Sequence, residues 1–316
     1  MKESYNQQNF PINIFSPYVV NINGRDYTIY KARFNTLHSL YTYLISNPKI
    51  NSDIFEITDS DEQDSCFAGR SFNETLDSLV NLDHLDNFEI DDILRLKNNL
   101  IKAKSIKTQK YKTVKTVAGG RVNVPAYCAG APLVYEETHK VSQPKFIKIY
   151  VTLSYDKNTT DKQIQNRAII IANIIKALEH SGYIVDLNSV MLSKVEDEIA
   201  YIIVQIKKYN ESLNISSFYK TQCNKEFLRR ILFRVLETMD FQRRGWGWSY
   251  GISCKEEMIR ELLDLQKGDI LIQEPIKLNI KGGDLMEDFT SVIETLGLQD
   301  IIDIKSSNPV LERKLR

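Results

Sequence analysis

The sequence predicts an α/β protein: a three-layer core with a mostly parallel sheet, flanked by smaller α+β parts at both ends. Three neighbouring segments lead to this prediction. An apolar run from Phe146 to Leu153 precedes a long amphipathic helix pattern from Thr160 to Gly182, and a second apolar run from Tyr183 to Leu187 follows it. A strand, a helix and a strand in this order form a unit whose two strands should be parallel, joined by a right-handed crossover.

The composition restricts the class of protein. The chain has 316 residues, of which 42% are hydrophobic and 26% charged, and its formal net charge is zero. A unit of this size buries about three quarters of its surface, and the composition excludes disorder and disulfide scaffolds. The four cysteines lie far apart and predict reduced thiols in a cytosol. No apolar stretch approaches the roughly 18 residues that span a bilayer, so no membrane partner is expected.

Local signals within the core support each element. From Phe146 to Leu153, β-branched and aromatic residues follow one another with little alternation, which is typical of a strand buried on both faces. Thr160 and Gln163 form a capping box at the start of the helix. A further strand, Ile199 to Ile206, should join the same sheet, and a helix from Phe227 to Met239 should cover it.

Both ends of the chain predict smaller α+β parts. Asn23-Gly24 lies between two alternating apolar runs, which is the strongest short-range hairpin signal, and a helix should follow from Leu37 to Leu44. The C-terminal part should contain two helices and two strands: Lys255 to Leu265, Asp269 to Ile272, Ile276 to Ile280, and Met286 to Leu296. We therefore divide the chain into an N-terminal unit (1–60), an acidic then basic connecting region (61–145), the α/β core (146–240) and a C-terminal part (241–316).

Two blocks of opposite charge lie side by side in the connecting region. Residues 51–92 contain thirteen acidic residues and one Arg, and residues 93–121 contain nine basic residues and no acid. In one interpretation the acidic block and a basic helix, Arg95 to Lys107, are solvated and partly neutralise each other. In the other, the basic block binds an anionic partner such as nucleic acid. Its candidate residues are Lys104, Lys107, Lys110 and Lys112.

The segment from Val117 to Pro132 is rich in glycine and has two interpretations. Its glycines bracket an extended piece in which Arg121 is the single charged residue, so the segment could approach a phosphate group. Alternatively, it is a structural crossing segment that packs against the core, with Cys128 as a small buried hydrophobe.

Common catalytic signatures are absent, so no catalytic residue is identified and an enzyme is the less favoured reading. Polar residues do follow the first core strand, at the edge where open α/β sheets bind ligands. Thr152, Ser154 and Asp156 there, with Asp186 at the end of the next strand, are candidate oxygen ligands for Mg²⁺. The alternative is that these residues only cap the following helix.

An aromatic loop follows the core. Arg243 and Arg244 precede Trp246 and Trp248, the two tryptophans of the protein. These side chains could stack on nucleic-acid bases or form a hot spot for a protein partner. In the alternative interpretation, the loop plugs the junction between the core and the C-terminal part.

Over residues 65 to 240 the chain resembles a family of uncharacterised proteins (a domain of unknown function) encoded by tailed bacteriophages and prophages. The resemblance is carried by FAGRSFNETL (Phe67 to Leu76), VAGGRVNVPAYCAGAP (Val117 to Pro132), the segment Ile147 to Leu187, and FLRRILFRVLE (Phe227 to Glu237). The middle of that family is similar to a von Willebrand factor A-type domain, whose metal site is a DxSxS motif after the first strand. Thr152 stands where that Asp would be, Ser154 stands where the first Ser would be, and no second Ser follows, which implies a degenerate metal site.

The resemblance implies a non-enzymatic protein-binding adaptor that acts in phage assembly or host takeover. The expected partner is a phage or host protein, in the host cytoplasm or associated with the virion. An AAA-type ATPase is one candidate, because domains of this type sometimes act beside such ATPases. The first alternative is a nucleic-acid-binding protein that uses residues 95–121 and 243–250. The lesser alternative is a metal-dependent hydrolase, and Mg²⁺ is the one cofactor considered.

Overall fold

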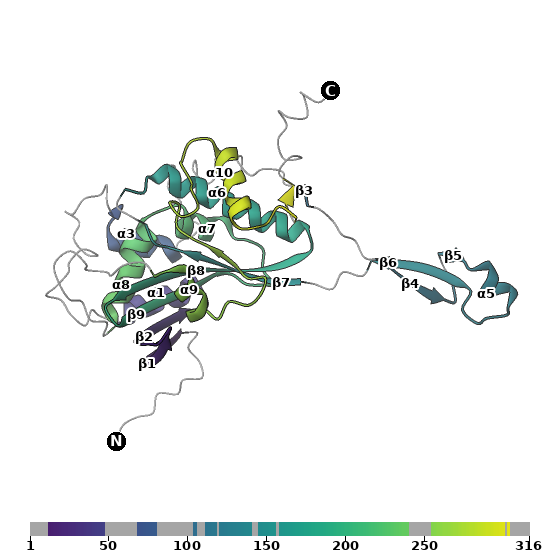
Figure 1. Ribbon diagram of the computed structural model, residues 1–316, viewed down its shortest axis with the longest axis horizontal. Helices are drawn as coiled ribbons and strands as arrows, with labels where there is room; N and C mark the ends of the chain where they lie inside the picture. The colour runs from purple at the N-terminus through teal and green to yellow at the C-terminus, as the bar shows by residue number, and fades with distance from the viewer. Residues whose placement is uncertain are drawn as a thin grey trace, which may run out of the picture.

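A computed structural model describes residues 12–47, 68–80, 104–105, 111–118, 120–140, 145–155, 158–239, 254–300 and 302–303. These residues form a central six-stranded sheet with helices on its faces, a two-stranded sheet, and a three-stranded sheet that projects from the body (Figure 1). The predicted α/β class is confirmed. Within the described ranges, no helix is both long enough and apolar enough to cross a membrane.

The central sheet has the strand order β1-β2-β9-β8-β7-β10. The strands are β1 (Ile12–Ile22), β2 (Arg25–Phe34), β7 (Lys145–Thr152), β8 (Tyr183–Val195), β9 (Glu198–Lys207) and β10 (Ile270–Ile272). Three of the five pairings are parallel, namely β2 with β9, β7 with β8, and β7 with β10. The predicted mostly parallel sheet is therefore confirmed, and the strand predicted at Ile199 to Ile206 joins it antiparallel to β8.

The strand-helix-strand unit forms as predicted. Helix α6 (Asp161–His180) begins with the capping box of Thr160 and Gln163 and connects β7 to the parallel strand β8. β8 is longer than the predicted Tyr183 to Leu187, because it continues to Val195 and turns directly into β9. The turn is tight because Glu196 adopts a positive φ of 50°.

The N-terminal hairpin belongs to the same sheet. Asn23 (φ 52°) and Gly24 (φ 82°) both have the left-handed backbone of a tight hairpin turn between β1 and β2, as the Asn-Gly pair predicted. β2 then pairs in parallel with β9. Helix α1 (Leu37–Ser46) follows β2 and starts with a capping box at Thr36.

Helices cover the two faces of the sheet unequally. Over β7 and β8 lie α6, α7 (Ile215–Gln222) and α10 (Leu285–Thr295); over β2 and β9 lie α1, α3 (Phe72–Val80), the π-helix η1 (Phe227–Leu232) and α8 (Phe233–Thr238). On the opposite face, the helix that packs on the sheet within the described residues is α9 (Glu256–Leu262). The predicted apolar side of the Phe227 to Met239 helix is buried throughout: Phe227, Leu228, Ile231, Leu232, Val235 and Leu236.

Two of the predicted secondary-structure elements are wrong in the described residues. Ile276 to Ile280 forms a turn and not a strand. The amide of Ile280 donates to the carbonyl of Pro275 (2.9 Å), a hydrogen bond within the segment that closes the turn. Lys104 and Ser105, predicted as helix, form the short strand β3 (Lys104–Ser105) with β11 (Ile302–Asp303). That pairing depends on residues almost 200 positions away, which local propensity cannot reveal. The other residues of Arg95 to Lys107 lie outside the described residues.

Residues 111–140 form the projecting unit, which we call the arm (Figure 1). Its strands are β4 (Tyr111–Thr116), β5 (Arg121–Val122) and β6 (Tyr135–Lys140), in the antiparallel order β4-β6-β5. The interpretation of Val117 to Pro132 as an extended segment packed on the core is wrong. Asn123 caps a short helix, α5 (Val124–Cys128), Pro125 lies in its first turn, and Cys128 is exposed and not buried.

Candidate functional site

Thr152 ends β7 at the edge where the sequence predicted a cation site. Its side chain is 3% exposed, and its hydroxyl donates to the carbonyl of Ile272 at the end of β10 (3.4 Å). Its own carbonyl accepts a hydrogen bond from the guanidinium of Arg167 (2.9 Å). The hydroxyl and carbonyl oxygens of Thr152 are therefore both engaged within the fold.

Arg167 is a fully buried cation at this edge. Its Nη1 donates to the carbonyls of Thr152 and Gln273 (2.9 and 3.2 Å), and its Nη2 donates to the hydroxyl of Tyr155 (2.5 Å). The guanidinium also stacks over the Tyr155 ring at 4.9 Å, and burial raises the pKa of that tyrosine. A positive charge already occupies the position, and it disfavours a second cation there.

The other predicted cation ligands do not gather at this edge. Asp186 pairs with Lys148 in the register of β7 and β8, four residues before the level of Thr152, which is about 13 Å along the strand. Its Oδ1 accepts hydrogen bonds from the side-chain amides of Asn188 (3.1 Å) and Gln205 (2.9 Å).

Ser154 is half-buried and follows Thr152, and Asp156 lies outside the described residues. In the described part of the chain, no three His, Cys, Asp or Glu side chains come together as a metal site.

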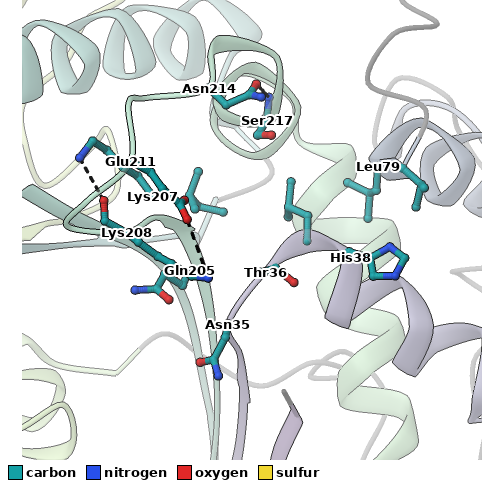
Figure 2. A pocket seen from close by; sticks show the side chains of 13 residues that line it. Asn35, Thr36, His38, Leu79, Gln205, Lys207, Lys208, Glu211, Asn214 and Ser217 are labelled. Atoms are coloured by element: carbon teal, nitrogen blue, oxygen red, sulfur yellow. Dashed lines mark hydrogen bonds and ion pairs between the residues drawn. The ribbon is translucent and has the colours of Figure 1, made fainter. Parts of the chain in front are cut away.

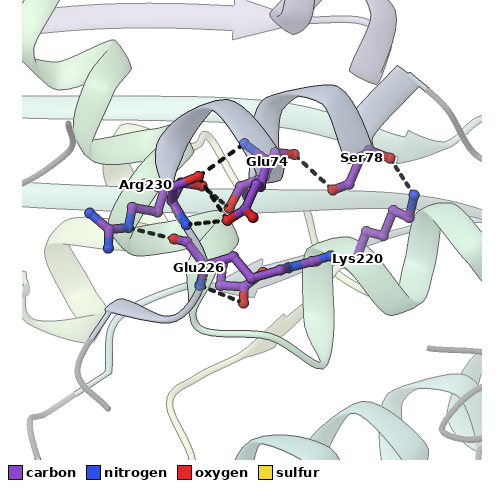
Figure 3. A network of polar contacts seen from close by, with 8 residues as sticks. Glu74, Ser78, Lys220, Glu226 and Arg230 are labelled. Atoms are coloured by element: carbon purple, nitrogen blue, oxygen red, sulfur yellow. Dashed lines mark hydrogen bonds and ion pairs between the residues drawn. The ribbon is translucent and has the colours of Figure 1, made fainter. Parts of the chain in front are cut away.

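The motif FAGRSFNETL has a structural role in the segment that leads into α3. Glu226, just before the π-helix, accepts the backbone amide of Arg70 (3.0 Å) and pairs with its guanidinium (Figure 3). Gly69 has a φ of 76°, and a Cβ at that position would lie 2.2 Å from Cγ of Glu226. The motif therefore needs glycine at position 69 for close approach.

Two further contacts hold α3 against the neighbouring helices. Arg230 donates from Nε to the carbonyl of Arg70 (2.8 Å), and the ammonium of Lys220 donates to the carbonyl of Ser78 (Figure 3). α3 is thus fixed at both ends, and the π-helical turn of η1 carries Arg230. π-helical turns are frequent at functional sites, and here the turn aims a buried arginine at a backbone carbonyl.

The predicted basic residues are divided among separate elements. Lys104 lies in β3, while Lys112 and Arg121 lie in β4 and β5, the two edge strands of the arm. Arg121 is exposed. The remaining predicted residues, Lys107, Lys110, Arg243, Arg244, Trp246 and Trp248, lie outside the described residues.

The arm exposes large apolar side chains. Neither the composition nor the hydrophobic periodicity of the sequence indicated that these side chains lie at the surface. Their exposed fractions are 75% for Val117, 43% for Val122, 61% for Val124, 67% for Tyr127 and 40% for Leu133. None of the side chains described in the arm is buried. The one local signal was Asn123 followed by Pro125, which marks the start of a helix and places Val124 and Tyr127 on it.

Internal hydrogen bonds give the arm its shape. The side-chain amide of Asn123 donates to Glu136, and its backbone amide donates to the carbonyl of Val134 (2.7 Å). The Asn123 carboxamide oxygen accepts the amide of Ala126 (3.0 Å), which caps α5. The arm therefore presents its apolar side chains on an ordered scaffold.

Comparisons with curated proteins and with solved structures give no match. A family model does match almost the whole of the part described above, from the first residue of β1 to the end of the α10 region. The chain belongs to the family of the domain of unknown function DUF7192, whose model matches residues 12–300.

Proposed function

We propose that the protein is a non-enzymatic adaptor that binds another protein through its arm. The observation that supports this proposal is the exposure of five large apolar side chains on the arm, in β5, in α5 and in the segments between its elements. Apolar side chains that gather on the surface of a folded protein mark interaction sites. Tyr127, with an apolar ring and a polar hydroxyl, is of the residue type that contributes most at interfaces.

The energetics of the arm support the same proposal. Those side chains of the arm that the structure describes are all exposed or half-buried, so they contribute little hydrophobic stabilisation to the arm. Covering a valine or tyrosine that is now exposed stabilises the complex by roughly 1–2 kcal/mol for each side chain. A partner that covers these side chains therefore gains binding free energy and also stabilises the folded arm.

The charges on the arm define the chemistry of the partner. Among its described side chains, the exposed charged residues are Lys115 and Arg121, while the acidic Glu136 is half-buried and bonded to Asn123. We expect the partner to offer an apolar surface with an acidic rim, because complementary charges favour the correct partner and speed association.

The biological setting is also a proposal, and it rests on the resemblance of the four sequence segments to phage and prophage proteins. In this setting, the α/β core is a degenerate von Willebrand factor A-like domain. The adaptor acts in assembly or host takeover, in the host cytoplasm or on the virion. Its partner is a phage or host protein, with an AAA-type ATPase as one candidate.

The test is affinity purification of the full chain from producing cells, with the bound proteins quantified. Val124→Ser and Tyr127→Ser should each reduce capture of the same partner about tenfold, because each removes an apolar contact worth roughly 1–2 kcal/mol. Ile45→Ser, which changes a side chain of α1 that is 59% exposed, is the matched control. The proposal is contradicted if Val124→Ser and Tyr127→Ser capture the same proteins in the same amounts as the control Ile45→Ser.

Nucleic-acid binding is the second candidate, because Lys115 and Arg121 are exposed on the arm. It predicts affinity for single- or double-stranded DNA or RNA that falls steeply with salt and is lost in Lys115→Glu and Arg121→Glu. Binding in fluorescence anisotropy that is equally strong in those variants, or absent at low salt, excludes this candidate. No observation on the described residues favours a metal-dependent hydrolase.

A further inference from the structure

A pocket of about 280 Å³ opens at the ends of two parallel strands. β2 and β9 run in parallel; β2 ends at Phe34, opposite Val204, and β9 continues to Lys207. Each strand leads into a helix, α1 after β2 and α7 after β9, and the first turns of both helices line the pocket (Figure 2). Ligands of open α/β sheets bind at this kind of edge, beside the starts of the helices.

The two helix starts make the pocket electropositive. In α1 the hydroxyl of Thr36 caps the third amide, and in α7 the side chain of Asn214 does the same. The first two amides of each helix have no acceptor within the helix. Each helix end also carries about half a positive charge from its aligned peptide dipoles, so an anion between the two ends is stabilised.

Ser217 supplies an independent indication of a ligand. It is 8% exposed and lines the pocket beside Asn214 (Figure 2). Its amide donates to Asn214 (3.0 Å) and its carbonyl accepts from Thr221 (2.9 Å), but its hydroxyl has no partner in the described part of the chain. The hydroxyl is therefore available to donate to an acceptor bound in the pocket, and hydrogen bonds to charged acceptors are among the stronger ones.

Two lysines at the end of β9 line the pocket. Lys207 is 2% exposed, pairs with Glu179 (3.0 Å) and donates to the carbonyl of Val185 (2.8 Å), so its charge is offset by Glu179 and its ammonium is engaged within the fold. Lys208 is half-exposed, and its ammonium lies 3.9 Å from Glu211, the single acid among the lining residues. A pair this long and this exposed contributes little, so Lys208 can turn to a stronger anion.

The pocket also has an apolar part of its lining, formed by Leu37, Leu79, Val80 and Ile206. The polar residues Asn35, His38 and Gln205 complete the lining. We propose that this pocket binds a small organic phosphate. Its phosphate group faces the two helix starts, Ser217 and Lys208, and its carbon skeleton packs on the four apolar side chains. The site is separate from the arm and does not depend on the function proposed for it.

The test is isothermal titration calorimetry of the full chain at constant ionic strength, with inorganic phosphate, phenyl phosphate and benzoate as probes. Phenyl phosphate should bind more tightly than inorganic phosphate because of the apolar lining, and benzoate should bind most weakly. Ser217→Ala should weaken phenyl phosphate about tenfold, since a hydrogen bond to a charged group is lost. Lys208→Glu should weaken it further.

The matched control is Ser216→Ala, which changes the preceding residue of the same helical turn, a residue that does not line the pocket. It should bind phenyl phosphate as the unchanged protein does. The proposal is overturned if phenyl phosphate gives no saturable heat up to about 10 mM, or if Ser217→Ala and Ser216→Ala bind alike. It is also overturned if benzoate binds at least as tightly as phenyl phosphate, because the ligand would then be a carboxylate.

Discussion

Glu226 receives the backbone amide and the guanidinium of Arg70, at 3.0 Å in each case, across 156 positions of sequence. The carboxylate lies directly against Gly69, with no room for a side chain between them. This contact joins the start of α3 to the start of the π-helix and makes a single glycine essential to the packing of both.

Gly69→Ala should be strongly destabilising. The substitution places a methyl group 2.2 Å from Glu226 and also forces alanine into a left-handed backbone, so a loss of about 3 kcal/mol is expected. Urea denaturation measures it.

Gly24→Ala provides the control, because Gly24 has a similar φ of 82° and no atom within 4 Å of the added group. This variant should lose only the backbone part, about 1–2 kcal/mol. Equal losses at both positions would show that the Glu226 contact is unimportant.

Arg167→Met should destabilise the fold by about 3 kcal/mol, because two carbonyls and the Tyr155 hydroxyl lose their buried donor. Arg260→Met, at an exposed pair with Glu256, should change stability by less than about 0.5 kcal/mol. Chemical denaturation of both variants measures the difference. An Arg167 variant as stable as the Arg260 variant would mean that the buried guanidinium contributes nothing.

Mg²⁺ should leave thermal stability unchanged, because Arg167 places a positive charge against Thr152 and because Asp186 lies about 13 Å away along the strand. Differential scanning fluorimetry with Mg²⁺ and with a chelator measures this. A rise in Tm of more than about 2 °C that Thr152→Val abolishes would contradict the prediction and restore the cation site.

The cysteines should differ in reactivity. Cys128 is exposed on the arm, whereas Cys254 is 2% exposed and burial raises the pKa of its thiol to about 11. A thiol reagent at pH 8 should label Cys128 at once and Cys254 only after unfolding, since the thiolate is the reactive form. Mass spectrometry of labelled peptides reads out both sites. Rapid labelling of Cys254 in the folded protein would contradict its burial.

Cys254 should also make the protein less stable in alkali. The folded thiol has a pKa of about 11 against an ordinary value of 9.0, so the folded state holds the proton more tightly. This contribution is complete below pH 9 and is lost as pH rises from 9 to 11, at a rate of up to about 1.4 kcal/mol per pH unit. Cys254→Ala should show a shallower loss of unfolding free energy over this range. An identical slope in the variant would assign the pH dependence to other groups.

Tyr127→Ser should change the free energy of unfolding by less than about 0.5 kcal/mol, because the side chain is 67% exposed and packs on no core. Urea denaturation of the isolated protein checks this. A large loss would mean that the ring supports the fold, and Tyr127 would then be unsuitable as a probe of partner binding.

Elements with strong local signals were predictable. The Asn23-Gly24 turn, the Thr160 capping box and the apolar face from Phe227 to Leu236 each involve residues within one or two turns of one another. Local hydrogen bonds and hydrophobic periodicity select those conformations before any long-range contact forms. The short helix α7 was not predicted, although Asn214 three residues before Ser217 is an N-cap pattern, because its apolar run is too brief to show a period.

The candidate sites depended on contacts between distant residues. The amino acids alone establish an α/β chain with a parallel strand-helix-strand unit, because apolar pattern and capping are properties of neighbouring residues. Three features needed the folded chain: the register of β7 and β8, which places Asp186 opposite Lys148 and away from Thr152, the burial of Arg167 at that edge, and the meeting of α1 and α7 at one pocket. Each brings together segments separated by tens to hundreds of residues, and such pairings are selected by burial of the whole core, which no local segment specifies.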